Sequence, residues 1–252
     1  MLVAPATAFD ALFNFRDLGG FETITGEVTR YGHVFRSDGV HRCTPDDVRR
    51  LEQLGIRRVV DLRTVHERAD DGCFDPQHPH IDYRHVPILD DVSGAGKPSS
   101  LHDEPLVATY LDIVTARGER IVEALRWIVN SPGPVVFHCA AGKDRTGVVA
   151  ALALATIGVP DERIIADYAR SAEAMERLIA WYRERRNGEQ QLVVTRTEED
   201  DARLQRALSA DPAWMQFVLD AVRLEYGTVR RYLVAVGATP SLIDGLHTKL
   251  LG

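Results

Sequence analysis

Residues 134–147 read PVVFHCAAGKDRTG, and this stretch determines how the rest of the chain is interpreted. A short apolar run rich in β-branched residues leads to Cys139, which predicts a buried strand. A short loop containing Gly142 follows, and Arg145 lies six residues after Cys139. From Thr146 the sequence is apolar and rich in alanine, which predicts a buried helix. A thiol, a guanidinium group and a helix N-terminus should therefore surround one short loop.

A loop of this kind is suited to bind an anion. Its backbone N–H groups can converge on one point, and the helix N-terminus adds unpaired N–H groups and the positive end of its dipole. Arg145 supplies a planar fork that can bind two phosphoryl oxygens at once. Helix N-termini and nearby cations also favour the thiolate form of a cysteine. We therefore expect Cys139 to be a thiolate that attacks a bound phosphate ester.

The other residues of this stretch are expected to bind the substrate. We expect His138 to orient the loop rather than act as a base, and the Thr146 hydroxyl to contact the sulfur when it departs in the second step. Lys143 is either a solvated loop lysine or an extra positive charge that favours substrates with several phosphates. The predicted substrate-binding set is His138, Ala140, Ala141, Gly142, Lys143 and Thr146.

A nucleotide-binding loop is the nearest competing interpretation of the stretch. That loop needs a glycine five positions before the glycine of a Gly-Lys-Ser/Thr sequence. Here Phe137 occupies that position, and Asp144 follows Lys143. The sequence therefore excludes a nucleotide-binding loop.

Residues 138–147, HCAAGKDRTG, resemble the signature of the cysteine-dependent protein tyrosine phosphatase superfamily. The Lys-Asp pair within it is similar to the atypical bacterial branch of tyrosine and dual-specificity phosphatases, for which activity on phosphoinositides is also known. Other segments resemble that branch as well: NFRDLGG at 14–20, FRSD at 35–38, DLRT at 61–64 with Glu67, YGTV at 226–229 and YL at 232–233. The resemblance covers nearly the whole chain and implies a phosphatase-like α/β fold and a cysteinyl-phosphate intermediate.

The leaving oxygen needs a proton donor, and the sequence leaves three candidates for it. In the branch that the chain resembles, the loop aspartate, here Asp144, is proposed as the acid; otherwise Asp144 is a helix N-cap. Many relatives instead use an aspartate on a mobile upstream loop, where this chain has Asp90 and Asp91 but no Trp-Pro-Asp sequence. Asp61 is the remaining carboxylate, at the end of a predicted strand.

Arg63 follows Asp61 and stands four residues before Glu67. Arg63 and Glu67 form either an ion pair near the mouth of the pocket or an ordinary surface pair. We expect neither a metal ion nor an organic cofactor, because arginine and backbone amides take the place of a cation. The histidines show no spacing typical of metal ligands.

Composition restricts the class of protein. The chain has 252 residues, 45% hydrophobic and 27% charged, as in soluble globular proteins. A formal net charge of −7 argues against nucleic acid as the main partner. Three cysteines, few and odd in number, suit a reducing cytoplasm. No apolar run is long enough to span a membrane and no secretory signal is evident, so we expect a cytoplasmic protein that is not integral to a membrane, with non-classical export left open.

Residues 1–252 should form a single α/β domain with a mostly parallel central sheet flanked by helices. Central strands are predicted at 56–62 and 83–89, and Gly118 should divide two helices between 106 and 130. Residues 172–210 are predicted to be a helical insertion, with a narrow apolar stripe from Met175 to Tyr182. This insertion either covers the pocket as a lid or simply packs on the domain.

The predicted activity is hydrolysis of phosphate monoesters, namely phosphotyrosine and also phosphoserine or phosphothreonine, through a cysteinyl-phosphate. The partners would be a phosphorylated protein as substrate and inorganic phosphate as the product held in the loop. One alternative is a phosphatase of phosphoinositides or inositol phosphates that uses the same loop. Another is a pseudophosphatase that binds phosphate without hydrolysing esters.

Overall fold

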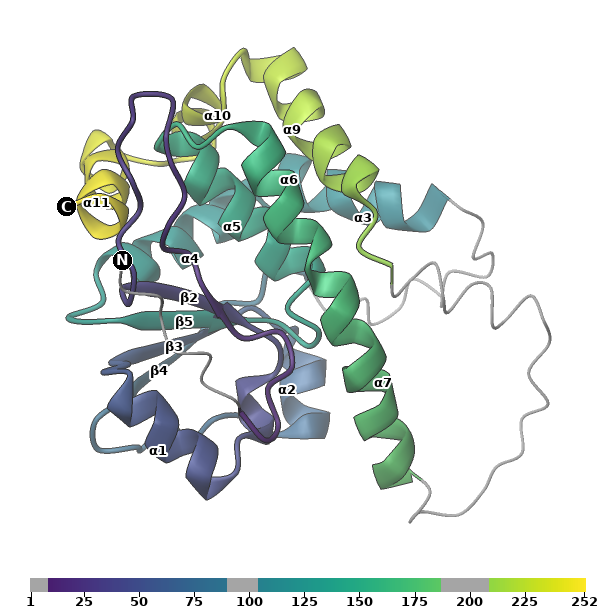
Figure 1. Cartoon of the computed structure of the whole chain (residues 1–252). Helices are drawn as coiled ribbons and strands as arrows, with labels where there is room; N and C mark the ends of the chain where they lie inside the picture. Colours follow the sequence, from purple (N-terminus) through teal and green to yellow (C-terminus); the bar gives the residue numbers. More distant parts are fainter. Residues whose placement is uncertain (1–8, 90–103, 187–208) are drawn as a thin grey trace.

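The computed structural model describes residues 9–89, 104–186 and 209–252. Within them the chain forms a five-stranded sheet in the order β1-β2-β5-β3-β4, with helices on both faces (Figure 1). Only β1 is antiparallel to its neighbour, and the other pairs are parallel. The strands are β1 (Arg16–Asp17), β2 (Val34–Ser37), β3 (Arg58–Asp61), β4 (Asp82–His85) and β5 (Val135–His138). This arrangement confirms the predicted α/β fold.

The helices divide between the two faces of the sheet. Helices α1 (Pro45–Gln53) and α2 (Val65–Asp71) lie below the sheet in Figure 1, and most of the others lie above it. Residues of β3 alternate between the two cores: Val59 belongs to the core with α1, and Val60 to the larger core on the opposite face. The remaining helices are α3 (Glu104–Thr115), α4 (Gly118–Val129), α5 (Asp144–Thr156), α6 (Asp161–Ala169), α7 (Ser171–Arg186), α9 (Pro212–Tyr226), α10 (Val229–Ala235) and α11 (Pro240–Leu250).

Local sequence explains where several helices begin. Both α1 and α2 start with a capping box, formed by Thr44 with Asp47 and by Thr64 with Glu67. Helix α4 begins at Gly118, as predicted, and a Cβ at this position would lie 2.5 Å from the side chain of Val236. Gly118 therefore allows the start of α4 to approach the end of α10 closely.

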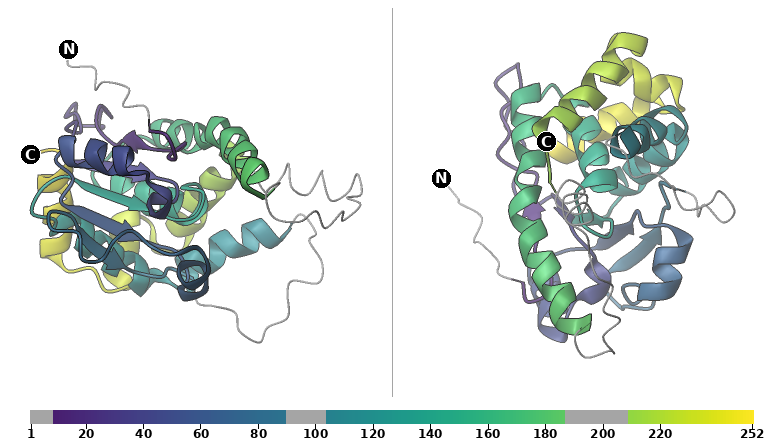
Figure 2. Two further views of the ribbon diagram at one scale, coloured as in Figure 1. Left: turned by 90° about the horizontal axis from the view of Figure 1, so that it is seen from below. Right: turned by 90° about the vertical axis from the view of Figure 1, so that its right-hand side faces the viewer.

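Helix α7 continues from α6 and runs along the outside of the molecule beside the N-terminal segment (Figure 2). Its buried residues Ala174, Met175 and Leu178 form a small core with Phe13 and Ala141. The first part of the predicted 172–210 insertion is thus a helix that packs on the domain. Residues 187–208 lie outside the described residues, as do Asp90 and Asp91, so the lid and these two aspartates stay predictions. In the described ranges, no helix is both long and apolar enough to cross a membrane.

Candidate active site

The structure forms the predicted strand, loop and helix around Cys139. Strand β5 ends at His138, helix α5 begins at Asp144, and residues 139–143, here called the signature loop, connect them. Strand β5 lies in the middle of the sheet, between β2 and β3, so the loop stands at the carboxyl edge where ligands bind in open α/β sheets. Cys139 is a free thiol and its side chain is buried.

Three successive carbonyl groups of the signature loop are bound by other parts of the chain. The Ala140 carbonyl accepts from the backbone N–H of Gly39 (3.1 Å), and the Ala141 carbonyl from the Asn14 amide (2.9 Å). The Gly142 carbonyl accepts from the Arg36 guanidinium (2.7 Å). In the described ranges, the N–H groups of these three loop residues bind no acceptor. The loop therefore has its carbonyls fixed outward and its amides available for an anion.

Gly142 is required by the shape of this loop. Its φ is +68°, in the region that favours glycine, and a Cβ there would lie 2.4 Å from the Ser37 carbonyl oxygen. Contact between the loop and the end of β2 thus leaves no room for a side chain.

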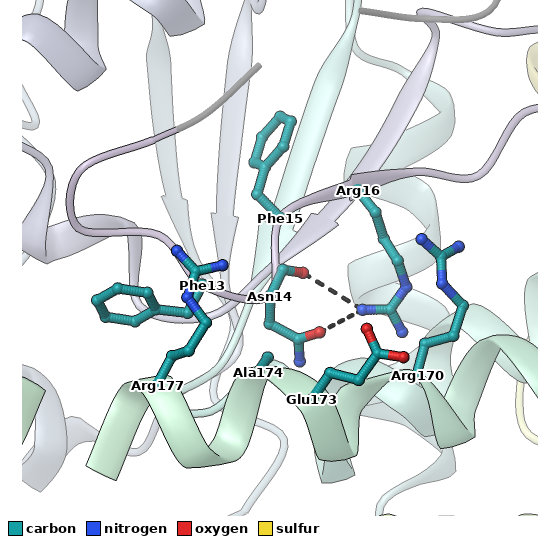
Figure 3. A pocket seen from close by; sticks show the side chains of 8 residues that line it. All are labelled: Phe13, Asn14, Phe15, Arg16, Arg170, Glu173, Ala174 and Arg177. Carbon is teal, nitrogen blue, oxygen red and sulfur yellow. Dashed lines mark hydrogen bonds between the residues drawn. The ribbon is translucent and has the colours of Figure 1, made fainter. Parts of the chain in front are cut away.

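A buried charge cluster lies behind the loop. Asp167 on α6 binds Arg16 (2.7 Å) and Arg36 (2.7 Å), and Arg36 in turn binds the loop. Burial alone would raise the pKa of Asp167, but the two guanidinium groups lower it. Arg16 also binds the backbone carbonyl and side-chain oxygen of Asn14, at the wall of a pocket of about 170 Å³ between the N-terminal segment and α7 (Figure 3). The cluster fixes Asn14 and Arg36, which hold the loop.

The Arg145 guanidinium is oriented by Glu67. Two hydrogen bonds of 2.5 and 2.7 Å join them, and the same carboxylate accepts from the Thr64 N–H to cap α2. Burial would lower the pKa of Arg145, but the hydrogen bonds and the charge of Glu67 raise it, so the guanidinium is positive. The predicted Arg63–Glu67 pair is wrong. Arg63 is buried and binds Asp61 (2.8 Å), because it precedes the first turn of α2 and turns inward.

His138 and Asp61 lie beneath the loop. His138 is fully buried, its Nδ1 is 3.1 Å from the Cys139 carbonyl, and its Nε2 is 3.8 Å from Asp61. Burial lowers the pKa of His138. Burial would raise the pKa of Asp61, but His138 and Arg63 hold it below the usual range. Since Asp61 is also fully buried, it is poorly placed to act as the acid.

The structure excludes one of the two interpretations of Lys143 and one of the two interpretations of Asp144. Lys143 is 1% exposed, so the prediction of a solvated lysine is wrong. Its Nζ donates to the Ser209 carbonyl (3.0 Å) and lies 5.1 Å from the centre of the Trp214 ring. The N-cap of α5 is Lys143, so the N-cap role considered for Asp144 is also wrong. Asp144 Oδ1 instead accepts a hydrogen bond of 2.5 Å from the hydroxyl of Tyr110 on α3.

The Thr146 hydroxyl is buried at the start of α5. Thr146 is fully buried, and among the described residues its Oγ1 has no hydrogen-bond partner. The contact expected between this hydroxyl and the departing sulfur in the second step stays a prediction.

Residues 7–252 match the tyrosine phosphatase family. The chain belongs to this family. It is 32% identical over 173 residues to a protein of Cupriavidus necator that carries the name of a tyrosine-protein phosphatase; the match covers 65% of this chain and 62% of that protein's length. The family membership confirms the predicted relation to the bacterial tyrosine phosphatases and the predicted enzyme class, protein-tyrosine phosphatase.

Two further matches cover a larger share of the length of the similar protein. The triple specificity protein phosphatase PtpB of Mycobacterium tuberculosis is 27% identical over 274 residues, which cover 95% of this chain and 97% of PtpB. A crystal structure of TpbA from P. aeruginosa is 17% identical with a TM-score of 0.37, over 72% of this chain and 90% of that one.

Two residues that contact the phosphatase site were missed from the sequence. Tyr110 lies within residues 106–130, for which the sequence predicts only two helices, and the sequence gives no role to Asp167. Neither stands in a motif with the loop, and both reach it only through helix packing. The helical periodicity around Tyr110 was a correct signal for burial, but it carries no information about the partner of its hydroxyl.

Proposed function

We propose that this tyrosine phosphatase hydrolyses phosphate monoesters in two steps, with Cys139 as the nucleophile. The observation that supports this most is the signature loop itself. Its carbonyls are bound by Asn14, Gly39 and Arg36, so its amides are left to face a ligand beside the buried thiol. A thiolate held with Arg145 at such a loop can attack a phosphorus atom bound there.

In the first step the Cys139 sulfur attacks phosphorus, and the bond from phosphorus to the leaving oxygen breaks. The loop amides and Arg145 stabilise the charge on the three equatorial oxygens. Asp144 donates a proton to the leaving oxygen. In the second step water attacks the phosphorus of the cysteinyl-phosphate, Asp144 accepts a proton from it, and the sulfur departs. Inorganic phosphate is then released from the loop.

The pairing with Glu67 leaves Arg145 able to bind the substrate. A guanidinium group has five N–H donors, and Glu67 takes two of them. Three donors therefore remain for phosphoryl oxygens. The contact with α2 fixes the plane of the guanidinium before the substrate arrives, which lowers the cost of ordering it on binding.

Phosphotyrosine is the substrate class that we propose first, with phosphoserine and phosphothreonine as further substrates. A range beyond phosphotyrosine is supported by the similarity to a protein named as a triple specificity phosphatase. Phosphoinositides remain a second candidate, but Lys143, whose charge was the reason to consider them, binds Ser209 and Trp214. We also propose a cytoplasmic location, because the three cysteines are free.

Two variants test the nucleophile. Cys139→Ser should lose turnover while it still binds inorganic phosphate, measured by calorimetry, because the loop and Arg145 are unchanged. Cys73→Ser is the matched control, since this half-buried cysteine lies outside the site and its loss should leave the rate unchanged. Full activity of Cys139→Ser would overturn the mechanism. Phosphate binding without turnover in the unmodified protein would indicate a pseudophosphatase.

Rates on a panel of phosphopeptides and phosphoinositides test the substrate class. We expect phosphotyrosine peptides to give the highest kcat/KM. A clear preference for phosphoinositides would replace the first proposal by the second.

A further inference from the structure

Two tyrosine hydroxyls form a chain of hydrogen bonds that ends at the side chain of Asp144. The Tyr110 hydroxyl on α3 lies 2.5 Å from Asp144 Oδ1, and the Tyr168 hydroxyl on α6 lies 2.6 Å from the Tyr110 hydroxyl. Both tyrosines are 1% exposed, and their rings pack edge to face. Buried hydroxyls with such short contacts have few alternative partners, so the donors and acceptors around them determine the direction of each hydrogen bond.

Each tyrosine hydroxyl has one proton to donate. Burial and the charge of Asp144 raise the pKa of both Tyr110 and Tyr168, so both keep that proton. The Tyr110 hydroxyl donates its hydrogen bond to Asp144 Oδ1, and the Tyr168 hydroxyl must then donate to the oxygen of Tyr110. The hydrogen bonds form a chain with one direction, which ends on Oδ1.

A second donor reaches the same oxygen. Lys143 Nζ lies 3.3 Å from Asp144 Oδ1, and an ammonium group donates but never accepts. A proton on Oδ1 would therefore face the Lys143 ammonium. Oδ1 is suited only to accept, and a protonated Asp144 must carry its proton on Oδ2.

We propose that Tyr110 is a positioning residue for catalysis, which together with Lys143 occupies Oδ1 of Asp144 and so places the transferable proton on Oδ2. This inference rests on the proposed role of Asp144 as the acid. When the bond from phosphorus to the leaving oxygen breaks, the proton moves from Oδ2 to that oxygen. The carboxylate that results keeps the hydrogen bond from Tyr110 and the charge of Lys143, both of which stabilise it.

The charged and titratable groups around this cluster come from several elements, and each affects its pH response. Besides Lys143, the positive charge of Arg145 acts on Asp144, and Arg36 and Asp211 act on Tyr168. Since Tyr110→Phe changes none of these charges, a shift of the pH profile in that variant reports the lost hydroxyl.

The test compares Tyr110→Phe with Tyr232→Phe on two aryl phosphates. Tyr232 is also fully buried, and its hydroxyl donates to the Val114 carbonyl on the same helix α3, away from Asp144. Phenyl phosphate has a leaving group that needs a proton, whereas 2,4-dinitrophenyl phosphate has one that does not. We expect Tyr110→Phe to lower kcat about tenfold on phenyl phosphate, as for loss of one hydrogen bond to a charged group, and less than about twofold on the dinitrophenyl ester.

The pH profile gives a second readout. Without the Tyr110 donor the carboxylate is less stable, so the pH at which kcat/KM falls on the alkaline side should move upward in Tyr110→Phe. Tyr232→Phe should change neither this profile nor the ratio of the two ester rates. Equal losses on both esters, an unchanged profile, or the same effects in Tyr232→Phe would overturn the inference.

The variant Asp144→Asn separates this inference from the proposed function. If Asp144→Asn slows phenyl phosphate selectively while Tyr110→Phe does not, Asp144 is the acid and Tyr110 does not position it. If Asp144→Asn slows both esters equally, the acid lies elsewhere and the proposed function itself must be revised.

Discussion

Asp167→Asn tests whether the charge cluster behind the loop stabilises the fold. The substitution keeps the shape of the side chain but removes the only carboxylate that binds both Arg16 and Arg36 among the described residues. The side chain of Asp167 is 2% exposed and that of Arg36 is 1% exposed, so water cannot replace the lost charge. Breaking a buried ion pair in this way costs about 3–5 kcal/mol. For a domain of this size that corresponds to a fall in Tm of about 6–20 °C.

Thermal and urea denaturation followed by circular dichroism at neutral pH measure this loss. Asp244→Asn is the matched control, because Asp244 is exposed on α11, and its effect should stay within about 0.5 kcal/mol. A loss below about 1 kcal/mol for Asp167→Asn, the size of a surface pair, would refute the reasoning.

The stability that Asp167 contributes should also depend on pH. Burial would raise the pKa of Asp167, but Arg36 and Arg16 lower it in the folded state. A carboxylate with a lowered folded pKa contributes stability that is complete above the unfolded pKa, near ~3.9 for aspartate, and is lost as the pH falls toward the folded pKa. The stability difference between the unmodified protein and Asp167→Asn should therefore shrink below about pH 4. A difference that stays constant in acid would contradict this assignment.

Two further variants test the loop and its arginine. Gly142→Ala should lower the free energy of unfolding by about 1–3 kcal/mol and sharply reduce kcat, because φ is +68° and the Cβ would meet the Ser37 carbonyl. Denaturation measures the first effect and steady-state kinetics the second. An unchanged kcat would contradict the role given to Gly142. Glu67→Gln should reduce kcat/KM about tenfold, since Arg145 loses its charged anchor. A kcat/KM equal to that of the unmodified protein would show that Arg145 is oriented without Glu67.

Local sequence patterns were sufficient to predict the core of the site. The β-branched run before Cys139 and the apolar stretch after Thr146 each extend over a complete element, so the strand, loop and helix follow from periodicity and end signals. Two segments that the resemblance singles out, NFRDLGG and FRSD, each contact the loop, through Asn14 and Arg36. Asp17 in the first segment instead accepts from the backbone N–H groups of Gly19 and Gly32.

The remaining contacts depend on tertiary packing that local patterns do not encode. Lys143 stands in a polar loop, for which a solvated side chain was one of two interpretations, but α9 places Trp214 over its ammonium group. Arg63 and Glu67 have the i, i+4 spacing of a helical pair, yet α2 begins only at Val65, so Arg63 is outside the helix. Tyr110 on α3 reaches Asp144 across more than thirty residues of sequence, a distance over which periodicity gives no register.

The most direct test of the mechanism is to trap the intermediate on Cys139. Rapid acid quench of the enzyme with a phosphotyrosine peptide, followed by mass spectrometry of its digest, should find phosphate on the peptide that contains Cys139. Asp144→Asn should accumulate more of this species with a dinitrophenyl ester, because the second step lacks its base. If Cys139 never carries phosphorus while the enzyme turns over, the cysteinyl-phosphate mechanism is contradicted.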